Sequence, residues 1–483
     1  MTRYSCRGSA GQGWRERAVK IQKGFRAVNL KEEQLRTRQS EGRQYGSNNA
    51  WYLNWSNGNV NNNNKSNNNY VRAVCEFWFL TNIRKGNMED KITLDEVFGA
   101  YMECRRNKRN TCNALAFETD YMRGCINLHK ELTDGTYRIG RSIAFLVTRP
   151  KLREVFAADF RDRIVHHLII RRLEPLFEEH FIEDCYNCRK GKGTLYGVKR
   201  LHGKIKECSH GYTRDCYVLK CDLQGFFMSI HKPTLWRMLE GFIRSRYKGA
   251  DISQLLWLTK TVVLHCPEKN CIVKGNREMW KRLSPDKSLF TSGDDYGLPI
   301  GNLTSQMFAN FYLSGIDRWL ERRFAYYGRY VDDFYVVSYD KRALLDVLPE
   351  LRKRLREQLG VTLHPRKMYL QHYTKGVTFT GSTSKMGRLY IGNRTVGNMT
   401  EAVREMNAVK DKAGYAERFA GRMNSYLGFM GHYHSYAIRR RLLGPVDKEW
   451  WKYCYISGHF QKVVLRQRYR HERKMKSINE LKL

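Results

Sequence analysis

Apolar residues recur at regular spacing along most of the chain, and this pattern begins near Leu94. In the run LDEVFGAYMECRR they return at helical spacing between Leu94 and Tyr101, which predicts a helix. Further helices are predicted at Phe160–Phe177, Leu344–Leu359 with a break at Pro349, and Glu401–Lys412. Short strands are predicted at Cys216–Cys221, Tyr335–Ser338 and Gly376–Phe379. This irregular alternation indicates a mixed α+β chain.

Two of the strand patterns carry carboxylates. The strand CYVLKCD alternates, with one apolar face from Tyr217 to Cys221 and an opposite face that ends in Asp222. The run GRYVDDFYVVSY predicts a hairpin with Asp332 and Asp333 at its turn. An isolated Asp-Asp pair is more often a turn former than a site. Here, however, two adjacent acids between apolar strands repel each other unless a cation neutralises them.

The spacing of these acids suits metal-assisted phosphoryl transfer. Two divalent ions about 3.5 to 4 Å apart require carboxylates that converge from separate strands, and hard oxygen ligands suit Mg²⁺. We therefore expect Asp222, Asp332 and Asp333 to be both catalytic residues and ligands of two Mg²⁺ ions, with Mn²⁺ as an alternative. Between them lies GLPIGNLTSQMFANFYLSGIDRWL, a glycine-rich turn that permits close backbone approach to a nucleotide, followed by a helical apolar pattern.

Charge and composition point to a nucleic-acid partner. The 483 residues include 86 Lys+Arg against 48 Asp+Glu, a formal charge of +38 that suits phosphate backbones. The 42% hydrophobic content argues for buried cores and against a merely basic tail. We expect a cytoplasmic protein without a membrane partner, because the chain shows neither a spanning apolar run nor a signal peptide. Its 13 cysteines include one CxxC pair, Cys185 and Cys188, which favours reduced buried thiols over zinc.

With these motifs in this order, residues 94–455 resemble reverse transcriptases, and most closely those of bacterial diversity-generating retroelements. The segment PKLREVFAADFRDRIVHHL at 150–168 is similar to the family's fingers motif for the triphosphate, and CRKGKGT at 188–194 to the next one. KCDLQGFF carries Asp222 and, at Phe227, the aromatic gate against a ribose 2′-OH. The resemblance implies that the nucleotide is bound by Lys151, Arg153, Leu223, Phe227, Ile300, Gly301 and Gln306.

One difference from most reverse transcriptases indicates which subgroup of the family the chain resembles. Most members have Gln-Gly before the helix and Ser-Pro within it, whereas this chain has Ile300-Gly301 and Ser305-Gln306. The form IGNLTSQ is typical of the diversity-generating group. The resemblance therefore implies an RNA-templated DNA polymerase that makes error-prone, adenine-mutagenised cDNA.

The resemblance also implies a right-hand fold and a set of partners. We expect an N-terminal segment at 1–93, fingers at 94–215, a palm at 216–385 with an insertion near 240–296, a thumb at 386–455 and a basic tail at 456–483. LHPRK (363–367) and GVTFTG (376–381) are similar to the closing palm motifs and primer grip, and 425–443 to the thumb helix. The implied partners are template RNA, primer and cDNA, dNTPs and the ring-forming accessory variability protein (Avd).

The asparagine-rich segment at 46–72 has no helical or strand period. Two interpretations stay open: a polar linker, or a translated template repeat that precedes an enzyme starting at Met88. We favour the second, because WYLNWSNGNVNNNNKSNNNYVRAV resembles the variable repeat of the lectin-like proteins that these retroelements diversify.

Several alternatives remain for function and for lesser residues. The chain could be a retron, group II intron-like or phage-defence reverse transcriptase, or an RNA-binding scaffold on a dead polymerase fold. All three carboxylates are present, which such a scaffold would not need. Phe227 would be a core residue if the alignment slipped by one position. Packing or backbone contacts are the expected role of Arg161, Arg163, His166 and His167, and no chemistry is assigned to Cys266 and Cys271.

Overall fold

A computed structural model describes residues 49–53, 60–64, 92–106, 111–148 and 151–467, and the chain divides into two compact units, Met1–Glu89 and Asp90–Leu483. In the first unit, β1 (Asn49–Leu53) and β2 (Val60–Asn64) pair antiparallel. The sequence had shown no strand period there. Met88 and most of the segment 1–93 lie outside the described residues.

The second unit begins with the helices α3 (Leu94–Arg105), α4 (Cys112–Thr119) and α5 (Tyr121–Thr133), and a fourth helix, α6 (Phe160–His180), comes after the strands β3 (Ser142–Val147) and β4 (Arg153–Ala157). The helix α3 starts at Leu94 as predicted. Thr93 caps it, because its hydroxyl accepts from the Glu96 backbone and the Glu96 carboxylate accepts from the Thr93 N–H. The two strands belong to a three-stranded sheet, in which β3 pairs antiparallel with β4 and parallel with β6 (Cys271–Lys274).

The central sheet has the order β7 (Tyr326–Tyr330), β8 (Asp333–Ser338), β5 (Tyr217–Asp222) and β9 (Tyr369–His372), all antiparallel. These bounds confirm the predicted strands at Cys216–Cys221 and Tyr335–Ser338. Val218 and Leu219 are both fully buried, so β5 is apolar on its two faces at the centre. The helix α7 (Thr194–Cys208) covers the face of β5 that carries Val218.

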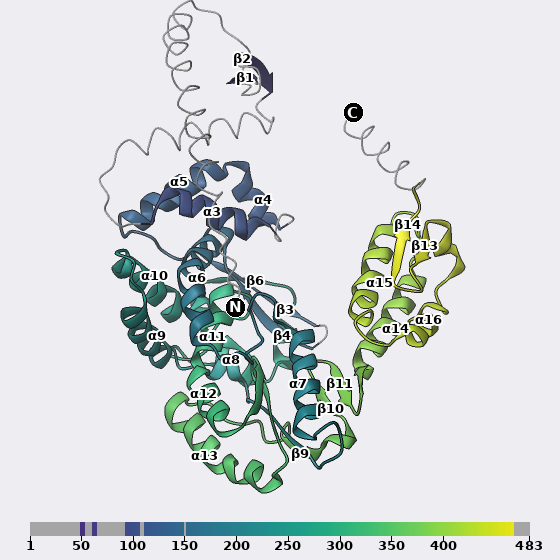
Figure 1. Cartoon of the computed structure of the whole chain (residues 1–483). Coiled ribbons are helices and arrows are strands. Elements are labelled where there is room, and N and C mark those ends of the chain that lie inside the picture. The colour runs from purple at the N-terminus through teal and green to yellow at the C-terminus, as the bar shows by residue number, and fades with distance from the viewer. Residues whose placement is uncertain (1–48, 54–59, 65–91, 107–110, 149–150, 468–483) are drawn as a thin grey trace, which may run out of the picture. The chain divides into compact units, whose positions relative to one another are not determined.

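The same region contains the helices α8 (Phe226–Ser229), α9 (Lys232–Arg246), α10 (Ile252–Leu264), α11 (Leu303–Tyr312), α12 (Ser314–Arg323) and α13 (Lys341–Leu359). The helix α12 packs on β7 and α13 on β8, whereas α9 and α10 lie beside α6 and α11 (Figure 1). The apolar pattern predicted after the glycine-rich turn forms α11 and α12, and its aromatic residues are buried. The predicted break at Pro349 was wrong, because α13 continues through it. Pro349 lies on the exposed side, where water can satisfy the carbonyl that loses its helical partner.

The C-terminal part begins with an antiparallel sheet of β10 (Val377–Phe379), β11 (Ser382–Lys385) and β12 (Arg388–Ile391). Three helices follow, α14 (Asn393–Asn407), α15 (Ala416–Met430) and α16 (Tyr436–Leu443). The last element is the hairpin of β13 (Cys454–Ser457) and β14 (Lys462–Leu465). Figure 1 shows the last three helices grouped with that hairpin. Short 3₁₀ helices occur at Pro267–Lys269, Arg277–Arg282, Pro285–Lys287, Leu289–Thr291, Tyr373–Lys375 and Lys448–Lys452.

Three boundaries in this part differ from the sequence prediction. The helix α14 ends at Asn407, not at Lys412, and the expected single helix at 425–443 is divided into α15 and α16 by the turn at 431–435. Ordered structure also extends past residue 455, because buried Val463 joins β14 to the apolar core of α14 to α16. Within the described residues, no helix is both long enough and apolar enough to cross a membrane.

Candidate active site

The three predicted carboxylates lie at one end of the central sheet. Asp222 ends β5 and pairs in register with Asp333, the first residue of β8. Val331 and Asp332 form the two-residue turn before it, and Val331 adopts φ +59°, a left-handed conformation common in such turns. The Asp332 carbonyl accepts a 3.2 Å hydrogen bond from the Leu223 N–H. The fold therefore brings together acids that are more than a hundred positions apart in the sequence.

The electrostatics of these carboxylates favour a nearby cation. Burial first, and then the charge of Asp222, raise the pKa of Asp332. Burial raises the pKa of Asp333 to about 7, and Asp332 and Asp222 add to that rise while Lys220 opposes it. The Asp333 Oδ1 atom is buried without a hydrogen-bond partner. Because burial and mutual repulsion both disfavour the charged forms, a bound cation would stabilise all three acids.

Two lysines pair with the carboxylates. The Lys367 Nζ atom is 2.8 Å from Asp222 Oδ1, and the Lys220 Nζ atom is 3.0 Å from Asp333 Oδ2. Neither lysine was among the site residues predicted from sequence. Strand spacing could have identified Lys220, because it lies two residues before Asp222 and hence on the same face of β5. Lys367 approaches from the loop before β9, which only the tertiary fold brings close.

The donor set fits a hard divalent cation. Its members are carboxylate oxygens from two strands, one of them buried without a partner, and such oxygens are the preferred ligands of Mg²⁺. Across the described part of the chain, no three His, Cys, Asp or Glu side chains are arranged closely enough to hold a metal ion. The ammonium groups of Lys367 and Lys220 supply positive charge beside Asp222 and Asp333.

The two predicted phosphate ligands belong to a basic group that faces these acids. Lys151 and Arg153 are exposed at the start of β4. The pKa of Lys151 is lowered by partial burial and by the charges of Lys367, Arg394 and Arg153, while Asp222 opposes this effect. The charge of Arg153 in turn lowers the pKa of Asp332. A group of neighbouring cations beside the carboxylates is a suitable site for a triphosphate.

Ile300 and Gly301 lie against β4. The Ile300 carbonyl accepts a 2.9 Å hydrogen bond from the Phe156 N–H. Gly301 has φ +124°, and an added Cβ would lie 2.9 Å from Val155 Cγ1. The glycine therefore permits close approach to the protein's own strand, whereas the sequence had suggested approach to a nucleotide. The Ile300 side chain packs on a small apolar cluster of Ala144, Phe156, Met228 and Leu289.

The remaining predicted nucleotide contacts differ in accessibility. Phe226 is a core residue, 2% exposed, whereas Phe227 is only partly buried and packs on the same cluster as Ile300. Leu223 is also 2% exposed, so its side chain is part of the core. The Gln306 side chain makes an internal contact, because its Oε1 atom accepts a hydrogen bond from the Cys188 thiol at 2.7 Å.

The residues assigned to packing make internal contacts. His166 is buried, with Nδ1 2.6 Å from Thr304 Oγ1. Arg163 donates to the Ala158 carbonyl at 2.9 Å, and Arg161 pairs with Glu131. The described cysteines are free thiols, and most of them are buried. Cys185 lies beside Arg329, whose guanidinium pairs with Asp317 in the core.

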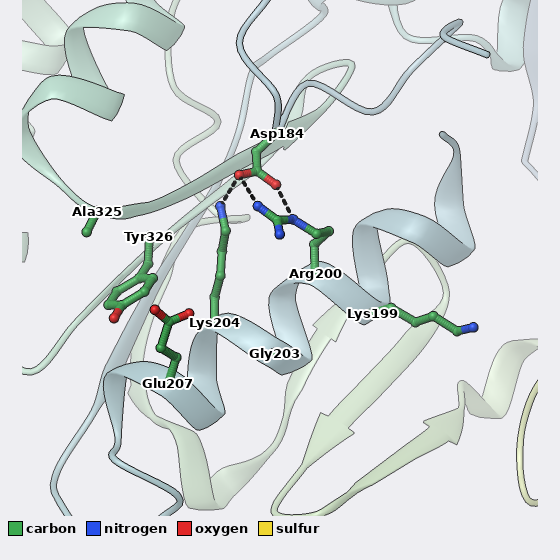
Figure 2. A pocket seen from close by; sticks show the side chains of 8 residues that line it. All are labelled: Asp184, Lys199, Arg200, Gly203, Lys204, Glu207, Ala325 and Tyr326. Atoms are coloured by element: carbon green, nitrogen blue, oxygen red, sulfur yellow. Dashed lines mark hydrogen bonds and ion pairs between the residues drawn. The ribbon is translucent and has the colours of Figure 1, made fainter. Parts of the chain in front are cut away.

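A separate cavity of about 440 Å³ lies along α7, and Figure 2 shows its lining. Asp184 accepts hydrogen bonds from Arg200 at 2.7 and 2.8 Å and from Lys204 at 2.5 Å. Lys204 also donates to the Tyr327 carbonyl on β7, and Lys199 points away from these groups. The lining includes none of the predicted site residues. The Lys204 ammonium in this lining connects α7 to β7 of the central sheet.

A comparison with known protein families finds a match for the region that contains the carboxylates. The family described as "Reverse transcriptase (RNA-dependent DNA polymerase)" matches residues 149–384, which include Asp222, Asp332 and Asp333. The chain contains a reverse transcriptase domain. This domain is an RNA-directed DNA polymerase domain, and its elements form the mixed α+β right-hand polymerase fold predicted from the sequence.

Individual proteins resemble the chain more distantly. Protein YkfC of Escherichia coli (strain K12) is 24% identical over 290 residues, which are 53% of this chain and 69% of YkfC. The apo telomerase of Candida Tropicalis is 12% identical with a TM-score of 0.42, over 67% of this chain and 60% of that one. The telomerase of Candida albicans in complex with a TWJ fragment of telomeric RNA is 10% identical with a TM-score of 0.36, over 69% and 60%. The chain thus spans about 60% of the length of these two telomerases.

Proposed function

We propose that the protein is the reverse transcriptase of a diversity-generating retroelement, which copies template RNA into adenine-mutagenised cDNA. The observation that carries this proposal is Ile300 in the sequence IGNLTSQ. It occupies the position of a glutamine in most reverse transcriptases, and its side chain packs on the apolar cluster beside Phe227. An isoleucine cannot hydrogen-bond near the incoming nucleotide, so incorrect pairs lose less transition-state binding relative to correct ones.

The proposed reaction is attack of a primer 3′-OH on the α-phosphate of a deoxynucleoside triphosphate. The hydroxyl loses its proton, the new phosphodiester bond forms, and the bond to the β-phosphate breaks to release pyrophosphate. Asp222, Asp332 and Asp333 would hold two Mg²⁺ ions, or Mn²⁺, which when bound activate the hydroxyl and neutralise the triphosphate. Lys151 and Arg153 bind the phosphates from β4, and Phe227 excludes a ribose 2′-OH. Lys220 and Lys367 hold the carboxylates in place from the central sheet and the adjacent loop.

The proposed partners follow from charge and from the family resemblance. A chain of +38 binds template RNA and the primer–cDNA duplex through their phosphates. The resemblance further suggests the ring-forming accessory variability protein as a partner that helps to bind template RNA, and a cytoplasmic location.

The test is primer extension by the purified chain on an RNA template, with dNTPs and Mg²⁺, followed by sequencing of the cDNA. Errors concentrated at template adenines are expected. Efficient synthesis with errors spread evenly over the four template bases would favour a retron-like or intron-like enzyme. Absence of synthesis with and without the accessory protein would favour an RNA-binding scaffold.

A further inference from the structure

Glu154 is a buried carboxylate in β4 that accepts hydrogen bonds from Trp280, Ser288 and Leu289, all in one distant segment. It is 1% exposed. Its oxygens accept from Trp280 Nε1 at 2.8 Å, from Ser288 Oγ at 2.7 Å and from the Leu289 N–H at 2.7 Å. A buried carboxylate is costly unless donors surround it, and bonds to a charged acceptor are the stronger kind. Glu154 therefore fastens this segment to β4.

Residues 277–291, which contain these three donors to Glu154, are called the buttress segment. It consists of three short 3₁₀ helices, Arg277–Arg282, Pro285–Lys287 and Leu289–Thr291. Such short helices have poor hydrogen-bond geometry and do not hold their shape alone. The position of the buttress segment therefore depends on its tertiary anchors, and Glu154 supplies three of them.

One end of the buttress segment supports the proposed nucleotide contacts. Leu289 is 2% exposed and belongs to the apolar cluster on which Phe227 and Ile300 pack. An added Cβ at Gly297 would lie 2.4 Å from Leu289 Cδ2, so the chain leading to Ile300 also lies against Leu289. The Leu298 N–H donates to the Phe227 carbonyl at 2.9 Å, which joins these two stretches.

The middle of the buttress segment touches the turn between Asp222 and Phe227. Gly225 has φ +52°, and an added Cβ would lie 2.6 Å from the Asp286 carbonyl oxygen. A hydrogen bond from Ser284 is the main cause that lowers the pKa of Asp286, and a hydrogen bond from the Gln224 side chain adds to this effect. A displacement of the buttress segment would thus reach both Phe227 and Ile300.

We propose that Glu154 is a positioning residue that, through the buttress segment, fixes Phe227 and Ile300 and so sets the selection of the incoming nucleotide. This inference rests on the proposed polymerase function. Glu154 itself touches no reacting atom. Its effect is transmitted by Leu289, which contacts the shared apolar cluster, and by Asp286, which contacts the turn at Gly225.

The inference is tested with full-length Glu154→Gln and Trp280→Phe in steady-state primer extension. Glu154→Gln keeps the shape but removes the charge, and Trp280→Phe removes one donor but keeps a ring beside Phe290. The matched control is Asp294→Asn, an exposed acid in the same connection that pairs with Lys269. For each variant, kcat and KM are measured for a deoxynucleotide and for the matching ribonucleotide, with RNA affinity and the melting temperature.

We expect Glu154→Gln to lower the ratio of deoxynucleotide to ribonucleotide kcat/KM roughly tenfold, because small misplacements at a reacting site have large effects. Trp280→Phe lowers this ratio less, Asp294→Asn leaves it unchanged, and all three retain RNA affinity. If the wild type is active, and the Glu154 and Trp280 variants melt earlier but keep the wild-type ratio of deoxynucleotide to ribonucleotide kcat/KM, the inference is wrong while the proposed function stands. A wild type without any synthesis overturns the proposed function and the inference together.

Discussion

Lys220 and Asp333 lie on the adjacent strands β5 and β8, and the Lys220 ammonium is 3.0 Å from the Asp333 Oδ2 atom. Both side chains are mostly buried, 16% and 20% exposed. The other oxygen of Asp333 has no hydrogen-bond partner. In the metal-free protein, Lys220 is therefore the cation that stabilises the charged form of Asp333 against burial and against its two acidic neighbours.

Lys220→Met should destabilise the metal-free protein by about 1–3 kcal/mol, because it leaves a mostly buried carboxylate without its partner. Adding Asp333→Asn should restore much of this loss, since the neutral amide needs no counter-charge. Chemical denaturation in the presence of a chelator measures both effects. Arg244→Met, which breaks an exposed i,i+4 pair with Glu240, is the control and should cost less than about 0.5 kcal/mol. A loss in Lys220→Met no larger than this control would contradict the prediction.

Asp332→Asn should abolish nucleotide incorporation while RNA affinity stays near that of the wild type. The substitution removes a proposed metal ligand, whereas the phosphate-binding charge is distributed elsewhere on a chain of +38. Primer extension and filter binding of labelled RNA measure the two properties. Synthesis at the wild-type rate would show that the metal assignment is wrong.

Phe227→Ala should allow ribonucleotides to compete with deoxynucleotides. The partly buried ring lies five residues after Asp222, and its removal would open space above the 2′-carbon of the sugar. Phe227→Leu should give an intermediate effect. The measurement is competition between the two sugars in primer extension, and unchanged discrimination in both variants would make Phe227 a packing residue.

Ile300→Gln should raise fidelity at template adenines more than at other bases, because the amide can hydrogen-bond near the nucleotide. The same change puts a polar group on the apolar cluster of Phe156 and Leu289, so a lower overall rate is also expected. Ile300→Val keeps the apolar contact and should retain the error spectrum. The test is to sequence the cDNA that the wild type, Ile300→Gln and Ile300→Val each copy from the same RNA. If wild type and Ile300→Gln make the same errors at adenine, the source of infidelity is not Ile300.

Acidification should destabilise the fold through its buried histidines. Burial first, and then His167, His265 and Arg163, lower the pKa of His166 to about 3, so the native state keeps it neutral while the unfolded chain protonates near its usual pKa of 6.5. The stabilisation is therefore complete above pH 6.5 and is lost progressively as the pH falls toward 3.

For His166 alone, the loss in unfolding free energy between pH 7.5 and pH 5.5 should be about 1.4 kcal/mol. His166→Asn, which keeps a polar group near Thr304, should lower stability at neutral pH but flatten this pH dependence. His432→Asn changes an exposed histidine and serves as the control. Denaturation at the two pH values measures the slope, and equal slopes in wild type and His166→Asn would contradict the assignment.

Local patterns failed where a distant part of the chain determined the outcome. Pro349 predicted a helix break, but only the fold shows that its side of α13 faces solvent. The family resemblance implied one helix at 425–443, yet the chain turns at 431–435, and α15 and α16 both bury residues in one core. The strand alternation predicted one apolar face of β5, but Val218 on the opposite face is also buried, because α7 packs over it.

The sequence by itself determined the mixed α+β class, the strand that ends at Asp222, and the hairpin with Asp332 and Asp333 at or beside its turn, although Asp333 proved to be the first residue of β8. These features are readable because strand alternation and hairpin length act over a few residues. Only the tertiary structure decided which cations meet the acids and what supports the nucleotide site. Lys367 reaches Asp222 across 145 positions, and Glu154 meets Leu289 across 135. Such contacts depend on how separate elements pack, and no local period in the sequence encodes that packing.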